Sequence, residues 1–150
     1  MKKWMMVTGL LFVGVVVAQV ASLAENIRAY ASWTRVNVNK INTAGAHPLG
    51  KDVYVNLAPD RLLSTNGNYK LPFAQGTIFV KERVDPQTLQ VTHIWVMQKR
   101  SNNAGDWAWA AYERKDNTIQ GGNLADPVMC VGCHQQASAT DQVFTQWGRR

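Results

Sequence analysis

The chain has 150 residues, of which 46% are hydrophobic, 9% aromatic and 17% charged, and its formal net charge is +6. This length suits one domain with one core, and neither an internal repeat nor a low-complexity linker divides it. The positive charge is spread along the sequence, without a basic run interleaved with aromatic residues. We therefore do not expect a nucleic-acid-binding protein, and the charge instead favours solubility and attraction to acidic partners.

Residues 1–24 have the pattern of an export signal, because two lysines precede an apolar stretch that ends in small residues. An uncleaved N-terminal anchor is the alternative, since residues 4–23 carry no charge and approach spanning length. We favour cleavage, because Gln19 and Ser22 shorten the strictly apolar part. In either case the folded part, residues 25–150, is expected outside the cytoplasm, in the periplasm.

The segment after this stretch indicates a short helix and then a loop. Ile27, Tyr30 and Trp33 fall near helical spacing, although a continuation into a strand through Val36 stays open. Small and turn-forming residues dominate positions 42–50, which we expect to form a loop.

The middle of the chain has the period-two alternation that is typical of half-buried strands. Asp85-Pro86-Gln87 indicates a turn, so the strands on either side of it are expected to pair as an antiparallel hairpin. Trp107 and Trp109 alternate with alanine, which predicts that both lie on one face of the last strand. The predicted strands cover residues 53–57, 76–84, 90–99 and 107–112, with loops at 64–70 and 101–106.

Near the C-terminus, Cys130, Cys133 and His134 form the sequence Cys-Val-Gly-Cys-His. This C-x-x-C-H pattern is typical of covalent c-type haem attachment. The two thiols can add to vinyl groups of one porphyrin, and the adjacent imidazole can bind the iron as its proximal ligand. We therefore predict one covalently bound haem c, with both cysteines as cofactor-binding residues and His134 as the metal ligand.

A redox disulfide and a zinc site are the alternatives for this pattern. A thioredoxin-like C-x-x-C normally begins a helix after a strand in a βαβ unit, whereas this one follows the turn signal Asp126-Pro127. A zinc site would draw its imidazoles from His47, His93 and His134, of which the first two are too far apart for the usual spacing. Haem attachment is thus the preferred interpretation, followed by the disulfide and then by zinc.

The sequence resembles the cytochrome P-460 family, which includes the β-rich cytochromes called c-prime-beta, over nearly all of residues 25–150. This resemblance and the predicted strands favour an α+β fold over a four-helix bundle of the cytochrome c-prime type. We expect mainly an antiparallel β-sheet with short helices and a C-terminal c-type haem-binding segment. The segments that carry the resemblance, besides C-x-x-C-H, are Gly76-Thr77-Ile78-Phe79-Val80-Lys81-Glu82, Gly105-Asp106-Trp107 and Asp141-Gln142-Val143-Phe144-Thr145.

The resemblance implies a special role for Lys81. In the hydroxylamine-oxidising members, the lysine of the Val-Lys-Glu segment is cross-linked to the haem ring, and it matches Lys81 here. Lys81 is therefore expected to be a catalytic and cofactor-binding residue. The residues alone favour the alternative, a solvated lysine that points outward from its strand. A lysine that points inward would lose its proton more readily and become nucleophilic.

Two positions depart from the family pattern. Lys51 matches an arginine that lies near the haem in some members, and a lysine keeps the charge but loses the planar fork. Trp95 matches a distal carboxylate of the hydroxylamine-oxidising members, and residues 88–104 contain no acid. A base must lie within hydrogen-bond reach of the proton that it takes, so this departure weighs against efficient proton removal. A core position for Trp95 is the alternative to a haem-facing one.

The sixth coordination position of the iron separates an electron carrier, which fills it with Met or His, from a ligand-binding haem. Met129 adjoins the haem-attachment sequence and is poorly placed for the opposite haem face, whereas His47 lies in a loop and stays available. The resemblance implies an open, five-coordinate iron with an apolar distal face, for which Phe79 and Trp95 are candidate lining residues. The candidate sixth ligands are Met97, Met129, His47 and His93.

Two functions follow from the resemblance. The first is the oxidation of hydroxylamine to nitrogen oxides at an open haem bonded to Lys81, with electrons passed to a soluble redox partner protein. The second is nitric oxide binding by a haem without this bond, as in the c-prime-beta cytochromes. Simple electron transfer would need a sixth protein ligand. We favour the enzyme slightly, and the resemblance further implies a homodimer.

Overall fold

The computed structural model describes residues 23–41, 47, 50–115 and 118–148. All but the last two residues of the expected export signal lie outside these residues, and so does most of the loop that is expected at 42–50. Within the described part of the chain, no helix is long and apolar enough to cross a membrane.

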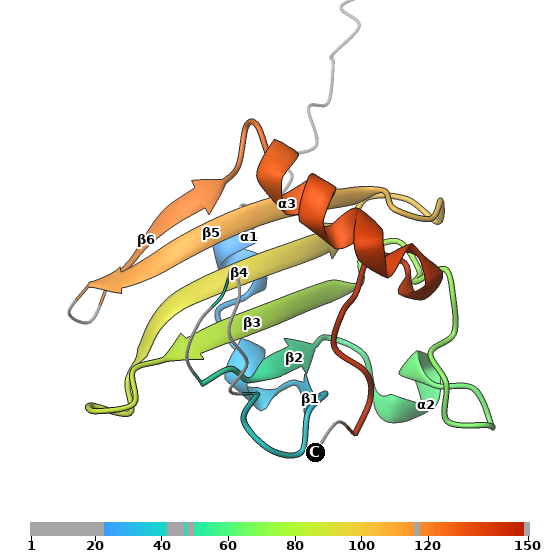
Figure 1. Ribbon diagram of the computed structural model, residues 1–150, viewed down its shortest axis with the longest axis horizontal. Helices are drawn as coiled ribbons and strands as arrows, with labels where there is room; N and C mark the ends of the chain where they lie inside the picture. Colours follow the sequence, from blue (N-terminus) through green and yellow to red (C-terminus); the bar gives the residue numbers. More distant parts are fainter. Residues whose placement is uncertain (1–22, 42–46, 48–49, 116–117, 149–150) are drawn as a thin grey trace, which may run out of the picture.

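One antiparallel sheet of six strands dominates the fold, and each strand pairs with the next one along the chain (Figure 1). The prediction of a mainly antiparallel sheet with short helices is confirmed, and β3 and β4 form the predicted hairpin. The strands are β1 (Thr34–Arg35), β2 (Val53–Val55), β3 (Ile78–Val84), β4 (Val91–Lys99), β5 (Trp107–Lys115) and β6 (Thr118–Asn123).

The sequence does not predict β1 and β6, the two edge strands. β1 has only two residues, and β6 is exposed along most of its length, so neither strand shows the alternation of buried side chains. Gly121 lets β6 approach β5 closely, because its φ is 134° and a Cβ here would lie 2.2 Å from the carbonyl oxygen of Ala111. The position of such an edge strand depends on how closely the two backbones can approach each other. Its sequence therefore shows little alternation of buried and exposed residues.

The helices are short, as expected, and the segment predicted as helical after residue 24 forms α1 (Leu23–Asn26) and a 3-10 turn at Tyr30–Ser32. The one-turn helix α2 (Pro59–Leu62) was not predicted, because the proline looked like the end of a strand. Proline is tolerated in the first turn of a helix, where its missing N–H has no intrahelical partner to lose.

The C-x-x-C-H sequence lies within α3 (Val128–His134), which continues into a 3-10 helix at Gln135–Thr140. A strand, β6, precedes this helix, with the Asp126-Pro127 turn between them. The βαβ unit is nevertheless absent from the described residues, because every strand pair of the sheet is antiparallel.

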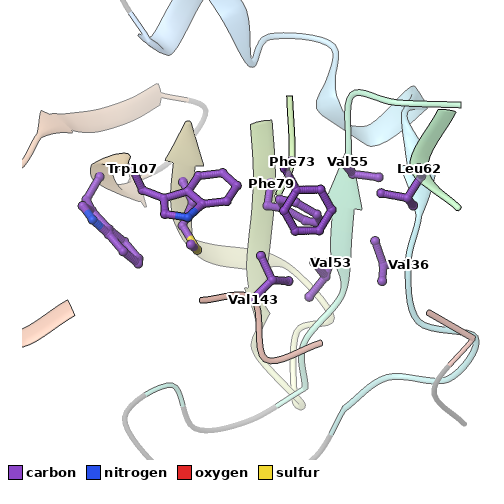
Figure 2. Close-up of a cluster of buried hydrophobic side chains, with 10 residues drawn as sticks. Val36, Val53, Val55, Leu62, Phe73, Phe79, Trp107 and Val143 are labelled. Atoms are coloured by element: carbon purple, nitrogen blue, oxygen red, sulfur yellow. The ribbon is translucent and has the colours of Figure 1, made fainter. Parts of the chain in front are cut away.

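The two faces of the sheet carry different hydrophobic clusters. α3 crosses one face in front of β4 and β5, and α1 lies behind the sheet (Figure 1). The rear cluster joins Ile27 and Tyr30 to β3, β4 and β5. On the front face, Phe73 and Phe79 pack edge-to-face with ring centroids 5.0 Å apart, beside Trp107 and Val143 (Figure 2). Trp107 and Trp109 both belong to this front cluster, as predicted.

A buried ion pair holds the C-terminal segment on the front face. The Nζ of Lys99 lies 2.8 and 2.6 Å from the two carboxylate oxygens of Asp141, and both side chains are almost fully buried. The same carboxylate accepts hydrogen bonds from the backbone N–H groups of Phe73 and Gly105, and the indole of Trp107 donates to the carbonyl of Asp141. Asp141, the residue after the 3-10 extension of α3, is thus tied to β4 and β5, to the segment before β3 and to the loop between β4 and β5.

Candidate functional site

The predicted site residues of the sheet lie on its front face. Lys81 of β3 pairs with Trp95 of β4, and Trp95 pairs in turn with Ala111 of β5. Directly paired residues of an antiparallel sheet point to the same face, so the side chains of Lys81 and Trp95 are neighbours. The next row on this face consists of Phe79, Met97 and Trp109.

A cavity of about 590 Å³, including the part that is open to solvent, is lined both by this face and by α3. The lining brings together Lys81 of the sheet with Cys130 and His134 of α3, which are far apart in the sequence. The two residues expected to line a distal pocket, Phe79 and Trp95, also face it.

His134, at the end of α3, is held in one orientation. Its Nδ1 lies 2.7 Å from the carbonyl oxygen of Gln142, and because a carbonyl only accepts, Nδ1 carries the proton. The ring packs edge-on against Trp109 and Phe144, with centroids 4.7 and 5.1 Å away. Burial lowers the pKa of the imidazole. A neutral ring whose Nδ1–H is bonded to a backbone carbonyl presents Nε2 as a metal ligand.

Cys130 and Cys133 are both free thiols, one turn apart on α3. Cys130 is half-buried and lines the cavity, where burial raises the pKa of its thiol, and Cys133 is exposed. Residues three apart lie on the same side of a helix, so the two thiols can reach one group beside α3.

Lys81 points into the cavity, in contrast to the outward orientation that the residues alone favoured. Burial, followed by the positive charge of Lys51, lowers the pKa of Lys81 to about 8, although a charge on Cys133 would act in the opposite direction. An amine with this pKa is neutral, and therefore nucleophilic, in about a tenth of the molecules at pH 7, a far larger fraction than for an ordinary lysine.

We expect the pH dependence of chemical labelling to reveal this shift. Lys81 is protonated below pH 8 and neutral above it, whereas an ordinary lysine titrates near about 10.4. In haem-free protein, the rate of reductive methylation of Lys81, followed by peptide mass spectrometry, should rise with a midpoint near pH 8. A midpoint near that of ordinary lysines would show that the amine is solvated.

His47 lies in the same cavity, and its ring packs edge-on against Trp95 with centroids 4.2 Å apart at 64°. Burial, and then the charges of Lys81, His134 and Lys51, lower the pKa of His47 to about 4, so the imidazole is neutral near pH 7. The sequence identified His47 only as one of several candidate sixth ligands. No periodic pattern in residues 42–50 indicates that this histidine meets β4.

The other candidates are distributed differently. Met97 lines the cavity, whereas Met129 is 89% exposed. His93 stacks on Trp95 with its Nδ1 3.1 Å from the hydroxyl of Thr92, and it is not among the described residues that line the cavity. Lys51 is buried and lies close enough to lower the pKa values of Lys81 and His47 without lining the cavity itself.

The residues around the cavity fit a haem. They offer two thiols on one side of α3, an oriented imidazole with Nε2 available, and an apolar wall formed by β3, β4 and β5. Within the described part of the chain, the buried Nδ1 of His47 has no hydrogen-bond partner, as expected of a group that faces a ligand. Among the described residues, no group of three or more His, Cys, Asp or Glu side chains could hold a metal ion by itself, which leaves the zinc alternative unsupported.

Comparison with known proteins gives a family and no curated relative. No curated protein matches the sequence. The family model described as Cytochrome P460 matches residues 27–145, a span that contains the whole sheet, α3 and every residue of the cavity. The chain belongs to the cytochrome P460 family.

Proposed function

We propose that this protein is an exported, monohaem c-type cytochrome that oxidises hydroxylamine to nitrogen oxides at an open haem face. Membership of the family implies that it binds haem. The observation that supports the enzyme most strongly is that Lys81, with a lowered pKa, shares one cavity with Cys130 and His134.

In this proposal α3 binds the cofactor. Cys130 and Cys133 each add a thiol across a vinyl group of one haem, so that a C–S and a C–H bond form and no oxidant is needed. His134 coordinates the iron through Nε2, because Nδ1 donates to the carbonyl of Gln142. The rings of Trp109 and Phe144 keep water from this side and hold the imidazole upright.

Lys81 approaches the haem from the sheet in this proposal. Its neutral amine would be the group that bonds to a ring carbon, with one N–H and one ring C–H bond broken and an N–C bond formed. An oxidant of the peroxide class would have to take up the electron pair and both protons. The low pKa supports this step, because only the unprotonated amine has a lone pair to donate.

When bound, the haem supplies an iron that holds hydroxylamine and accepts its electrons. Oxidation of hydroxylamine to nitric oxide releases protons and electrons in equal number, so the protein must accept both. The apolar side chains of Phe79, Met97 and Val143 exclude bulk water from the cavity. The electrons would leave to a soluble redox partner, for which α3, with its exposed Cys133, is the proposed docking element.

The substitution Lys81→Ala tests this proposal. The wild-type holoprotein should show a red-shifted, broadened ferrous Soret band and should reduce a dye acceptor when hydroxylamine is added. The variant should show an ordinary c-type spectrum and lose most of the dye reduction. Replacing the similarly buried Lys51 by Ala is the matched control, which should leave the spectrum modified. A modified spectrum that survives Lys81→Ala would refute the assignment of the bond.

Nitric oxide binding without catalysis is the second candidate, and one observation favours it. β4 contains no acid, and the cavity wall beside Trp95 is formed largely by apolar side chains. An ordinary c-type spectrum of the wild-type holoprotein, together with rapid nitric oxide binding and no dye reduction, would assign this function instead.

A further inference from the structure

His47 stands out among the polar groups of the cavity. Its ring contacts the indole of Trp95 on the front face of the sheet, and Trp95 pairs with Lys81 across β3 and β4. The imidazole therefore lies against the middle of the sheet, on the side of the cavity that carries Lys81. This is the region in which the sequence offers no acid, because Trp95 is present where a carboxylate was expected.

One ring nitrogen of His47 is available for a hydrogen bond. Its Nδ1 is buried and has no hydrogen-bond partner among the described residues, although a buried polar nitrogen without a partner is destabilising. Lone buried polar atoms of this kind are rare in native proteins and mark places where a ligand or water is bound. His134, the other imidazole of the cavity, is already bonded to the carbonyl of Gln142.

The chemical state of His47 suits a hydrogen-bonding role. Burial, and then nearby positive charge, lowers the pKa of the ring, so the imidazole is neutral and has one N–H donor and one nitrogen acceptor. The charged and titratable groups that act on it are Lys81, Lys51 and His134. A neutral imidazole can accept a hydrogen bond from the N–H or O–H of hydroxylamine and can also donate one to a bound oxygen atom.

We propose that His47 hydrogen-bonds the small ligand that enters the cavity and so takes the place of the missing carboxylate. Trp95 positions it by ring contact and does not itself act on the ligand. The inference rests on the proposed function, because it requires a haem whose open face meets this wall. It identifies the preferred ligand class as small nitrogenous molecules that carry hydrogen-bond donors.

The test uses the haem-loaded protein with His47→Ala and His47→Gln. The first removes the hydrogen bond, and the second keeps an acceptor and a donor. His93→Ala is the matched control, because His93 also stacks on Trp95 but already has Thr92 as a neighbour. Two quantities are measured: the dissociation constant of hydroxylamine for the ferric protein without an electron acceptor, and the C–O stretching frequency of carbon monoxide on the ferrous protein.

We expect His47→Ala to weaken hydroxylamine binding roughly tenfold, the loss that corresponds to one hydrogen bond. His47→Gln should recover part of this loss, and His93→Ala should change neither quantity. The C–O stretch should shift to higher frequency in His47→Ala, because the oxygen loses a polar neighbour. If the wild-type protein binds no hydroxylamine while the stretch still shifts, the proposed substrate is wrong and the role of His47 stands.

Two results would overturn the inference. The first is that both quantities are the same in His47→Ala and in the wild type. The second is a low-spin ferric spectrum in the wild type that becomes high-spin in His47→Ala. His47 would then be the sixth iron ligand and would block the ligand site instead of hydrogen-bonding the ligand.

Discussion

Replacing both Cys130 and Cys133 by Ser is expected to abolish covalent haem attachment completely. A serine hydroxyl does not add to a vinyl group under conditions in which a thiol does, so the haem would be held by His134 alone. Haem staining after denaturing electrophoresis should then be positive for the wild type and negative for the double variant. A double variant that keeps its haem through denaturation would contradict the proposed attachment.

The single variants sharpen this prediction, because the two thiols have different surroundings. Cys130 lines the cavity and Cys133 is exposed. Each single Ser variant keeps one thioether bond, so each should retain haem under denaturing conditions. The loss of Cys130 should disturb the optical spectrum more than the loss of Cys133, because its sulfur is enclosed with the haem and not at the surface.

Replacing Asp141 by Asn is expected to cost about 3–5 kcal/mol of unfolding free energy, since it leaves the buried ammonium of Lys99 without a counter-charge. Asparagine tolerates the left-handed backbone of this position, where φ is 52°, so the change isolates the lost charge. Urea unfolding followed by tryptophan fluorescence measures the effect, because Trp107 contacts both partners.

Two further variants control this experiment. Arg100→Ala breaks an ion pair with Asp106 that is largely exposed, and it should change stability little. The double variant Lys99→Met with Asp141→Asn removes the uncompensated charge and should recover part of the loss. A single Asp141→Asn variant as stable as Arg100→Ala would show that the buried pair does not hold the C-terminal segment.

Asp141 also connects stability to the site. It precedes Gln142, whose carbonyl oxygen orients His134. If the C-terminal segment detached from the sheet, the proposed iron ligand, His134, would therefore lose its orientation even where the sheet stays folded. The Asp-Gln-Val-Phe-Thr segment, which carried part of the family resemblance, thus holds the C-terminal segment on the sheet through Asp141 and lines the cavity through Val143 and Phe144.

The strands with a buried face could be predicted from the sequence, because alternation marks them directly. β3 and β4 lie within two residues of their expected bounds, and the turn between them is present. β5 begins at its expected residue, Trp107, and runs three residues further than expected, to Lys115. β6 lacks buried residues and α2 has a single turn, so neither element has the repeated pattern on which prediction depends. By contrast, the residues that pair across neighbouring strands are determined by the tertiary fold, so the pattern within one strand does not predict them.

The site shows the same division. The spacing of Cys130, Cys133 and His134 indicated haem attachment from the sequence alone. Their role in binding haem stays a prediction. The inward orientation of Lys81 needed the sheet, because a strand pattern does not tell which face is covered by α3. His47 could not be singled out, since its contact with Trp95 joins a loop to a strand about fifty residues later.

Peptide mapping of the denatured wild-type holoprotein tests most directly the claim that α3 and the sheet hold one haem between them. After proteolysis, mass spectrometry should find a single haem joined to the peptide that contains Cys130 and Cys133 and also to the peptide that contains Lys81. The contradicting result is a haem that is extracted by acidified organic solvent and leaves both cysteines and Lys81 unmodified.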